Sequence, residues 1–351
     1  MQQLALLPKQ NEMQQMDLEL MMNKETIDMT KLQAANDCEL LDDSLVFLER
    51  KIKTPDITII KQKFDRCRAT RGTKCVQSMS FIGESGSGKS WLSEQYVEES
   101  PRYIEDGQKI VPVLYASLPE KATSKVMVSR LLRNLTELKT ISGTEENIQG
   151  RLVSRLIAAK TELIIIDETQ HLTRESSSIS IQHAADAIKT IMTDTRIPVV
   201  CVGMESSKSL LTGKTRFKHE RQLFRRNRRL HVLAPYEVGT EHWKSLVKQY
   251  QVILECEVNL TSEGMLKRLF AATGGLFGFL TPLFMEAIEI AGSTKAITQE
   301  VLAKAYVEFQ PEDTELLFNP FSATLAQVEV GLTKLLLKGK GKSKNKGKEK
   351  A

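Results

Sequence analysis

The chain has 351 residues, 41% of them hydrophobic, which is enough to bury the core of one large domain or two ordinary ones. Its formal net charge of +5 comes from the last fourteen residues, which hold seven lysines and one glutamate. No stretch reaches the roughly 18 consecutive apolar residues of a membrane span, no apolar signal core is present at the start, and the five scattered cysteines form no C-x-x-C pair. We therefore expect a cytoplasmic protein with no membrane partner, disulfide framework or zinc site.

The first segment, residues 1–45, is acidic, with nine acids against three lysines and only weak apolar periodicity. Such a composition predicts an extension without a core of its own. From residue 46 the helical pattern strengthens. Thr54-Pro55 is typical of a helix N-cap followed by proline at the first helical position.

Short apolar runs then alternate with helical patterns as far as residue 235. Apolar strands separated by helices are typical of a parallel sheet that is covered on both faces. We therefore predict an α/β fold in which residues 46–235 form a three-layer core around a parallel five-stranded sheet. The predicted strands are residues 76–82, 111–116, 163–166, 199–202 and 230–233, and the helices between them are residues 91–99, 124–138, 146–159 and 181–193.

Beyond Pro235 the strand patterns stop, and helical patterns at residues 241–251, 262–272, 276–291 and 299–309 follow. They predict a small all-helical domain over residues 236–310. Residues 311–351 form a C-terminal extension with one more expected helix at residues 324–337. Its Lys/Gly tail is expected to be disordered.

A phosphate-binding motif joins the first predicted strand to the next helix. The sequence matches G-x-x-x-x-G-K-[ST], whose glycines let backbone N–H groups curl around phosphates at a helix N-terminus. The lysine would reach the β- and γ-phosphates of ATP, and the hydroxyl would ligate Mg²⁺. The residues expected to bind nucleotide are Gly83, Glu84, Ser85, Gly86, Ser87, Gly88, Lys89, Ser90 and the adjoining Trp91.

Paired acids end the third predicted strand, in the run LIIIDE. Acids at the carboxyl end of a parallel strand lie in the crevice where such sheets bind ligands. We expect Asp167 to hold Mg²⁺ through water and Glu168 to activate the attacking water. Taken alone, the pair fits a strand cap equally well. The phosphate motif favours the catalytic interpretation, so ATP hydrolysis with Lys89 and Glu168 as catalytic residues is expected.

A cationic run from residue 214 to residue 229 holds eight Lys or Arg residues against Glu220 alone. Phosphoryl transfer needs positive charge near the γ-phosphate, and an arginine from a neighbouring subunit can supply it. Arg225 and Arg226 are the candidates for this catalytic role, with Arg216 and Arg221 behind them. A solvated or nucleic-acid-facing surface is the alternative.

With these residues in place, the chain resembles an AAA+ ATPase, and more narrowly the TnsC/TniB group of transposition regulators. The resemblance covers roughly residues 45–310. The phosphate motif and the paired acids are shared by P-loop ATPases in general. The segments IIIDETQHL, IPVVCVG, QLFRR and GGLFGFL indicate the narrower group.

The resemblance implies an AAA+ core followed by a helical lid, and assembly with ATP on double-stranded DNA as a ring or helical filament. It also implies that the homo-oligomer links a target-selector protein to a transposase, and that the arginine finger acts between subunits. By position, DNA would be contacted by Lys121, Thr123, Ser124 and Lys125, although a capped, exposed helix start explains these residues equally well. Two departures from the family pattern are a lid without an arginine near Phe277, and Asn227 at the position where an aromatic residue often follows the finger arginine. No polar sensor is evident after the fourth strand.

Three functions remain open from the sequence. The favoured one is an ATP-dependent, DNA-bound regulator that recruits a transposase. The second is a replication-initiator or helicase-loader ATPase, and the third is a DNA-independent ATPase in which the basic run serves subunit contacts only. The acidic N-terminal extension and the lysine tail are either docking segments or solubilising ends.

Overall fold

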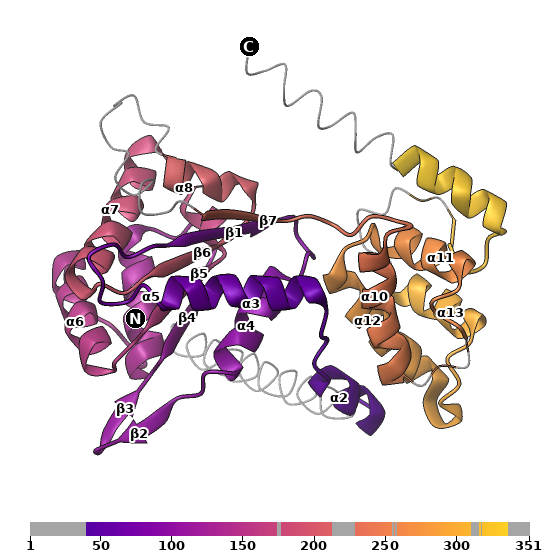
Figure 1. Ribbon diagram of the computed structural model, residues 1–351, viewed down its shortest axis with the longest axis horizontal. Helices are drawn as coiled ribbons and strands as arrows, with labels where there is room; N and C mark the ends of the chain where they lie inside the picture. The colour runs from indigo at the N-terminus through magenta and orange to yellow at the C-terminus, as the bar shows by residue number, and fades with distance from the viewer. Residues whose placement is uncertain are drawn as a thin grey trace, which may run out of the picture.

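A computed structural model describes residues 40–173, 177–212, 229–254, 256, 258–309, 316 and 318–335. Within them, a core built on a sheet lies beside a smaller helical domain (Figure 1). The sheet has the strand order β4-β5-β6-β1-β7, and every neighbouring pair is parallel. The predicted five-stranded parallel sheet is confirmed, with strands β1 (Met79–Gly83), β4 (Val113–Ser117), β5 (Leu163–Asp167), β6 (Val199–Gly203) and β7 (Arg229–Leu233).

Alternate residues of the central strands enter two separate apolar clusters, as the two-residue repeat of a strand requires. Leu163 and Ile165 pack with α3 (Pro55–Arg68), α4 (Lys89–Glu98) and the helical domain. Ile164 and Ile166 face the other way. The helices on that second face are α5 (Ser124–Thr136), α6 (Glu145–Ala158) and α7 (Ser178–Thr195). The core therefore has the three layers predicted from the apolar runs.

Four of these helices begin at a capping hydroxyl. The side chain of Thr54 accepts a hydrogen bond from the backbone N–H of Ile57, with Pro55 at the first helical position, as predicted. Thr123, Thr144 and Ser177 cap α5, α6 and α7 in the same way. Each cap satisfies a backbone donor that a helix N-terminus otherwise leaves free, so these residues fix where the helices start.

One feature of the core was not anticipated from the sequence. Strands β2 (Tyr103–Glu105) and β3 (Gln108–Ile110) form an antiparallel hairpin that projects from the core (Figure 1). Asp106 and Gly107 form its turn with φ of 51° and 75°. Asp-Gly is a recognised hairpin signal, but three-residue strands carry too little periodicity to reveal the hairpin.

The helical domain contains α10 (Glu241–Leu254), α11 (Glu263–Thr273), α12 (Phe277–Ala291) and α13 (Gln299–Phe309), close to the predicted spans. A further helix occupies residues 325–335. Among the described residues no single helix is both long and apolar enough to cross a membrane, and α11 with residues 277–294 has the required length and composition only as a pair bent by 106°. The shorter helices are η1 (Thr169–Leu172), η2 (Glu205–Ser207), α8 (Lys208–Thr212) and η3 (Gly292–Thr294).

The first described helix, α2 (Asp42–Glu49), packs against this helical domain. The rings of Phe47 and Tyr250 lie 6.2 Å apart, and Lys295 pairs with Asp43 at 2.6 Å. The boundary expected at residue 46 falls within α2. Residues 42–68 therefore connect the two parts of the molecule, because α2 contacts the helical domain and α3 contacts the sheet.

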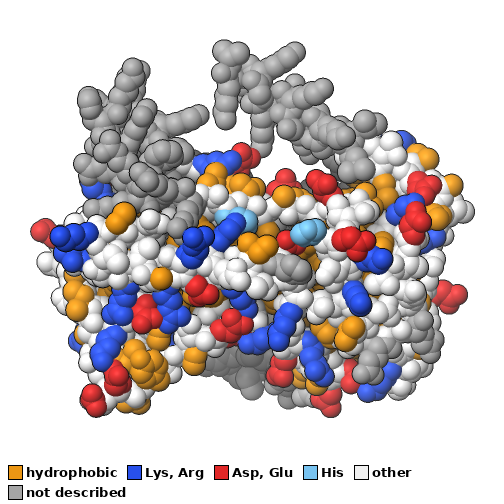
Figure 2. All heavy atoms as spheres, viewed as in Figure 1, with side chains coloured by type: hydrophobic (Ala, Val, Ile, Leu, Met, Phe, Trp, Pro, Cys, Tyr) orange, Lys and Arg blue, Asp and Glu red, His pale blue; other side chains and the backbone are white. Residues whose placement is uncertain are grey.

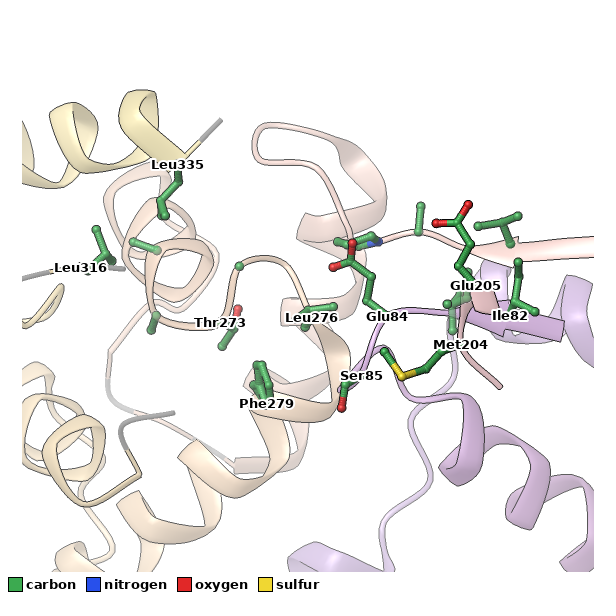
Figure 3. Close-up of a pocket in the computed structure, with 18 of the residues that line it drawn as sticks. Ile82, Glu84, Ser85, Met204, Glu205, Thr273, Leu276, Phe279, Leu316 and Leu335 are labelled. Atoms are coloured by element: carbon green, nitrogen blue, oxygen red, sulfur yellow. The ribbon is translucent and has the colours of Figure 1, made fainter. Parts of the chain in front are cut away.

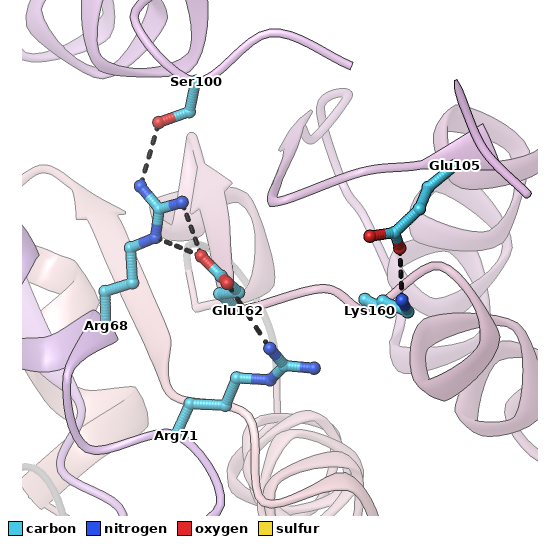
Figure 4. A network of polar contacts seen from close by, with 6 residues as sticks. All are labelled: Arg68, Arg71, Ser100, Glu105, Lys160 and Glu162. Carbon is cyan, nitrogen blue, oxygen red and sulfur yellow. Dashed lines mark hydrogen bonds and ion pairs between the residues drawn. The ribbon is translucent and has the colours of Figure 1, made fainter. Parts of the chain in front are cut away.

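Among the described residues, side chains of both charges are interspersed on the face seen in Figure 2. At the end of the sheet far from the phosphate motif, Glu162 accepts hydrogen bonds from Arg68 and Arg71, and Arg68 also donates to Ser100 (Figure 4). These contacts tie α3 to the start of β5 and the end of α4. Exposed pairs of this kind add little stability individually.

Replacing Phe64 with alanine tests the packing between α3 and the sheet. Phe64 is completely buried and meets the rings of Phe81 and Tyr96 edge-on at 5.8 and 5.1 Å. We expect Phe64→Ala to lower the free energy of unfolding by about 3–5 kcal/mol in a urea titration. Ile59→Ala on the same helix, where the side chain is 46% exposed, should cost less than about 1 kcal/mol. Equal losses in the two variants would contradict this packing.

Candidate functional site

The phosphate loop, residues 83–90, runs from the end of β1 into the first turn of α4. Gly86 and Gly88 have φ of 73° and 90°, a region that other residues rarely adopt. A Cβ at Gly83 would lie 2.6 Å from the carbonyl oxygen of Leu233. The loop therefore curls tightly where the sequence predicted it, and it opens the N-terminus of α4 toward an anion.

Lys89 lies inside this curl and is 7% exposed. Its Nζ donates to the carbonyl oxygen of Glu84 at 2.6 Å and to Ser87 Oγ at 3.2 Å. Burial lowers the pKa of the amine, whereas the negative charges of Asp167 and Glu168 act in the opposite direction. The amine is thus held by loop oxygens at the place where phosphate oxygens would meet it.

Asp167 ends β5 and is 1% exposed. It accepts a hydrogen bond from the hydroxyl of Tyr115 at 3.0 Å and another from the backbone N–H of Glu168 at 2.7 Å. Burial and the Asp167 charge raise the pKa of Tyr115, so this phenol stays a donor. Burial, followed by the Asp167 charge, also raises the pKa of Glu94. Tyr115 and Glu94 were missed because neither belongs to a motif.

Glu168 has φ of 58°, a left-handed conformation that is strained for a residue with a side chain. Its Oε2 accepts a hydrogen bond from Gln170 Nε2 and lies 3.5 Å from His171 Nε2. The paired acids therefore point to different partners, with Asp167 held by β4 and Glu168 held by η1.

The helical domain docks directly on the phosphate loop. The backbone N–H of Gly278 donates to the carbonyl oxygen of Gly86 at 2.6 Å, and a Cβ at Gly278 would lie equally close to that oxygen. Beside this contact, the rings of Trp91 and Phe277 are 4.9 Å apart. The helical domain therefore lies against the phosphate loop as a lid, and the contact is made by backbone and aromatic groups.

Next to this contact, a cavity of about 960 Å³ lies between the phosphate loop, the ends of β6 and β7, and the lid (Figure 3). Glu84 and Ser85 line it from the loop, Met204 and Glu205 line it from the end of β6, and Thr273, Leu276 and Phe279 line it from the lid. Its size is in the range of small-molecule sites. It lies beyond the carboxyl ends of the parallel strands, the position at which open α/β sheets bind ligands.

The oxygen atoms of Ser90 and Asp167 are of the kind that Mg²⁺ prefers, so these residues fit a nucleotide bound with its metal. The described residues contain no cluster of three His, Cys, Asp or Glu residues that could hold a metal ion by itself. A Mg²⁺ ion here would depend on Ser90, Asp167 and phosphate oxygens together, as is common for this ion. The metal and the nucleotide would then bind as one unit.

Of the other predicted site residues, the four candidates for DNA contact are described by the structure and the candidate arginines are not. Lys121, with φ of 53°, and Lys125 are exposed, Thr123 caps α5, and Ser124 is buried. The capping interpretation of this helix start is thus confirmed for Thr123, and a DNA contact by these four residues stays a prediction. Arg216, Arg221, Arg225 and Arg226 lie outside the described residues.

Comparison with known proteins assigns this chain to a family. The family model described as Bacterial TniB protein matches residues 46–231, more than half of the chain. The chain belongs to the TniB family. The predicted resemblance to the TnsC/TniB group is therefore confirmed at the level of the TniB family. A search of curated proteins found no match.

Solved structures support the same fold for this TniB-family chain. The Cdc6p protein of Pyrobaculum aerophilum aligns with a TM-score of 0.55 at 14% identity, covering 78% of this chain and 72% of that one. The Aeropyrum pernix ORC2 protein, in ADPNP-ADP complexes, aligns at 0.54 and 15% identity, covering 79% and 74%. The ORC1 protein of the same organism, in complex with DNA, aligns at 0.53 and 15%, covering 84% and 87%. These likenesses show that the parallel sheet core and the helical domain share the fold of those proteins.

Proposed function

We propose that this TniB-family protein binds ATP with Mg²⁺, hydrolyses it to ADP and phosphate, and regulates DNA transposition in the cytoplasm. In this proposal the protein assembles on double-stranded DNA as a ring or helical filament and recruits a transposase to a site given by a target selector. The observation that carries the proposal is the phosphate loop, in which Gly86 and Gly88 have positive φ and Lys89 is buried within the curl.

Each residue of the site has one role in this proposal. Lys89 and the loop amides hold the phosphates, and Ser90 and Asp167 hold Mg²⁺, which neutralises charge on the phosphates. Glu168 orients and deprotonates the attacking water. Tyr115 keeps Asp167 turned toward the loop through its hydrogen bond to Oδ2. Arg225 or Arg226 of a neighbouring subunit would contact the γ-phosphate.

DNA binding is supported by the family and by the exposed lysines before and within α5. The fold is compatible with it, since the ORC1 structure of the same fold was solved with DNA. Contacts by Lys121 and Lys125 would fall on phosphates, which fix register without reading sequence.

The decisive experiment measures ATP turnover with and without plain duplex DNA. We expect Mg²⁺-dependent hydrolysis that duplex DNA stimulates, and rings or filaments in electron micrographs with a slowly hydrolysed ATP analogue. Absence of Mg²⁺-dependent nucleotide binding would refute the whole proposal. An ATP turnover rate that duplex DNA does not change would instead favour a DNA-independent ATPase.

Deleting residues 338–351 tests the electrostatic part of DNA binding. The deleted segment carries seven lysines and one glutamate. If the tail contacts phosphates, we expect weaker binding to nonspecific duplex and a slope of log affinity against log salt that is less steep by about 1 per lost contact. Changing the seven lysines to serine at full length should reproduce the effect. An unaltered slope would assign the tail to another role.

A replication-initiator or helicase-loader function is the second candidate, because the structural neighbours include ORC and Cdc6 proteins. The two candidates differ in their protein partner. Co-purification with a replicative helicase would favour the second candidate, whereas ATP-dependent binding to a transposase would favour the first.

A further inference from the structure

The side chain of Gln170 connects two loops of the site. Gln170 lies in η1, just after β5, and is 6% exposed. Its Nε2 donates to Glu168 Oε2, and its Oε1 accepts a hydrogen bond from the backbone N–H of Met204 at 3.1 Å. Met204 is the first residue after β6. One amide group therefore joins the carboxylate of Glu168 to the end of the neighbouring strand.

The end of β6 packs so closely against this amide that only glycine fits at position 203. A Cβ at Gly203 would lie 2.6 Å from Gln170 Oε1, 2.7 Å from Thr169 Oγ1 and 2.4 Å from Ser207 Oγ. The hydroxyl of Thr169 also donates to the carbonyl oxygen of Val202 at 2.7 Å. Since a side chain at position 203 would displace Gln170, the glycine and the glutamine form one interlocked contact.

The last residue of β6 is Gly203 and the next residue is Met204, so neither position offers a polar side chain. The buried hydroxyl of Ser207, close by, has no hydrogen-bond partner in the part of the chain that the structure describes. Hence the polar connection between the end of β6 and Glu168 runs through Gln170. An amide suits this position because it offers a donor and an acceptor at once and does not titrate.

We propose that Gln170 is a positioning residue for hydrolysis, which fixes the carboxylate of Glu168 relative to the end of β6. The inference rests on the proposed ATP hydrolysis and adds a residue to it. Movement of β6 would then change the position of Glu168 and the rate of turnover. Gln170 itself contacts neither the nucleotide nor the water in this role.

Two substitutions test the hydrogen bond from Gln170 to Glu168, with and without the hydrogen bond to Met204. Gln170→Met keeps the length of the side chain and removes both hydrogen bonds, whereas Gln170→Glu keeps an acceptor for Met204 and loses the donor to Glu168. We expect kcat for ATP to fall roughly 100-fold in both, because a small misplacement of a reacting group has an effect of that size. KM and ATP affinity should change by less than about threefold. The matched control is Gln149→Met, whose amide bonds the carbonyl oxygen of Ala187 away from the site.

A double variant distinguishes positioning from general damage. If Gln170 acts through Glu168, adding Gln170→Met to Glu168→Gln should lower turnover no further. A multiplicative loss in the double variant, or a loss of ATP affinity in Gln170→Met equal to its loss of kcat, would make the role structural and overturn the inference. Active wild-type protein with equally active Gln170→Met also overturns it and leaves the proposed function standing. Wild-type protein that hydrolyses no ATP overturns both.

Discussion

Replacing Glu168 with glutamine is expected to slow turnover by roughly 100- to 10,000-fold while leaving ATP binding intact. The glutamine amide fills the same space but cannot take a proton from water, and general base catalysis contributes roughly 100- to 10,000-fold to a rate. ATP should therefore stay bound, and the protein should accumulate in its assembled, ATP-loaded form on DNA. Steady-state phosphate release and sedimentation with duplex DNA, measured on the same sample, test both parts.

Glu162→Gln is the matched control, since Glu162 precedes β5 and Glu168 follows it. Glu162 bonds Arg68 and Arg71 at the opposite end of the strand (Figure 4). Its loss should change stability slightly and leave kcat within about twofold. Normal turnover in Glu168→Gln would remove this residue from the mechanism.

Replacing Lys89 with alanine is expected to remove nucleotide binding itself. A hydrogen bond to a charged group contributes about 1.5–3 kcal/mol, so loss of two contacts with phosphate weakens affinity by roughly 100-fold or more. Nucleotide-dependent assembly should disappear with it. Titration with a fluorescent ATP analogue measures the affinity directly.

Lys61→Ala serves as the control for this loss of charge, because Lys61 forms a surface pair with Glu99. Its affinity for ATP should match that of the wild type. If Lys89→Ala kept wild-type affinity, the hydrogen bonds of Lys89 to Glu84 and Ser87 would be only structural.

The sequence was informative wherever a feature depends on a local motif or on the local periodicity of apolar residues. The phosphate loop, the acids after β5 and the order of strands and helices all came from local patterns, which depend on residues near one another in the chain. The capping hydroxyl of Thr54 and the start of α3 were predicted for the same reason.

Contacts between distant segments could not be obtained this way. The hydrogen bond of Tyr115 to Asp167, the bridge from Gln170 to Met204 and the packing of α2 against the lid join residues from 34 to more than 200 positions apart. Periodicity carries no information on such pairs. Gln170, two residues after Glu168, can be read in the sequence, but only the fold shows that its side chain contacts the backbone of Met204 at the end of β6.

The backbone bond between Gly278 and Gly86 has a thermodynamic consequence. A ligand that reorients the Gly86 peptide while this bond is kept would also shift the orientation of α12, so occupancy of the loop and the angle of the lid would be coupled. Linkage is reciprocal, so a neighbouring subunit that holds the lid in one orientation would change ATP affinity by the same factor by which ATP changes the affinity between subunits. Cooperative assembly could therefore arise without any side chain that reads the γ-phosphate from the lid.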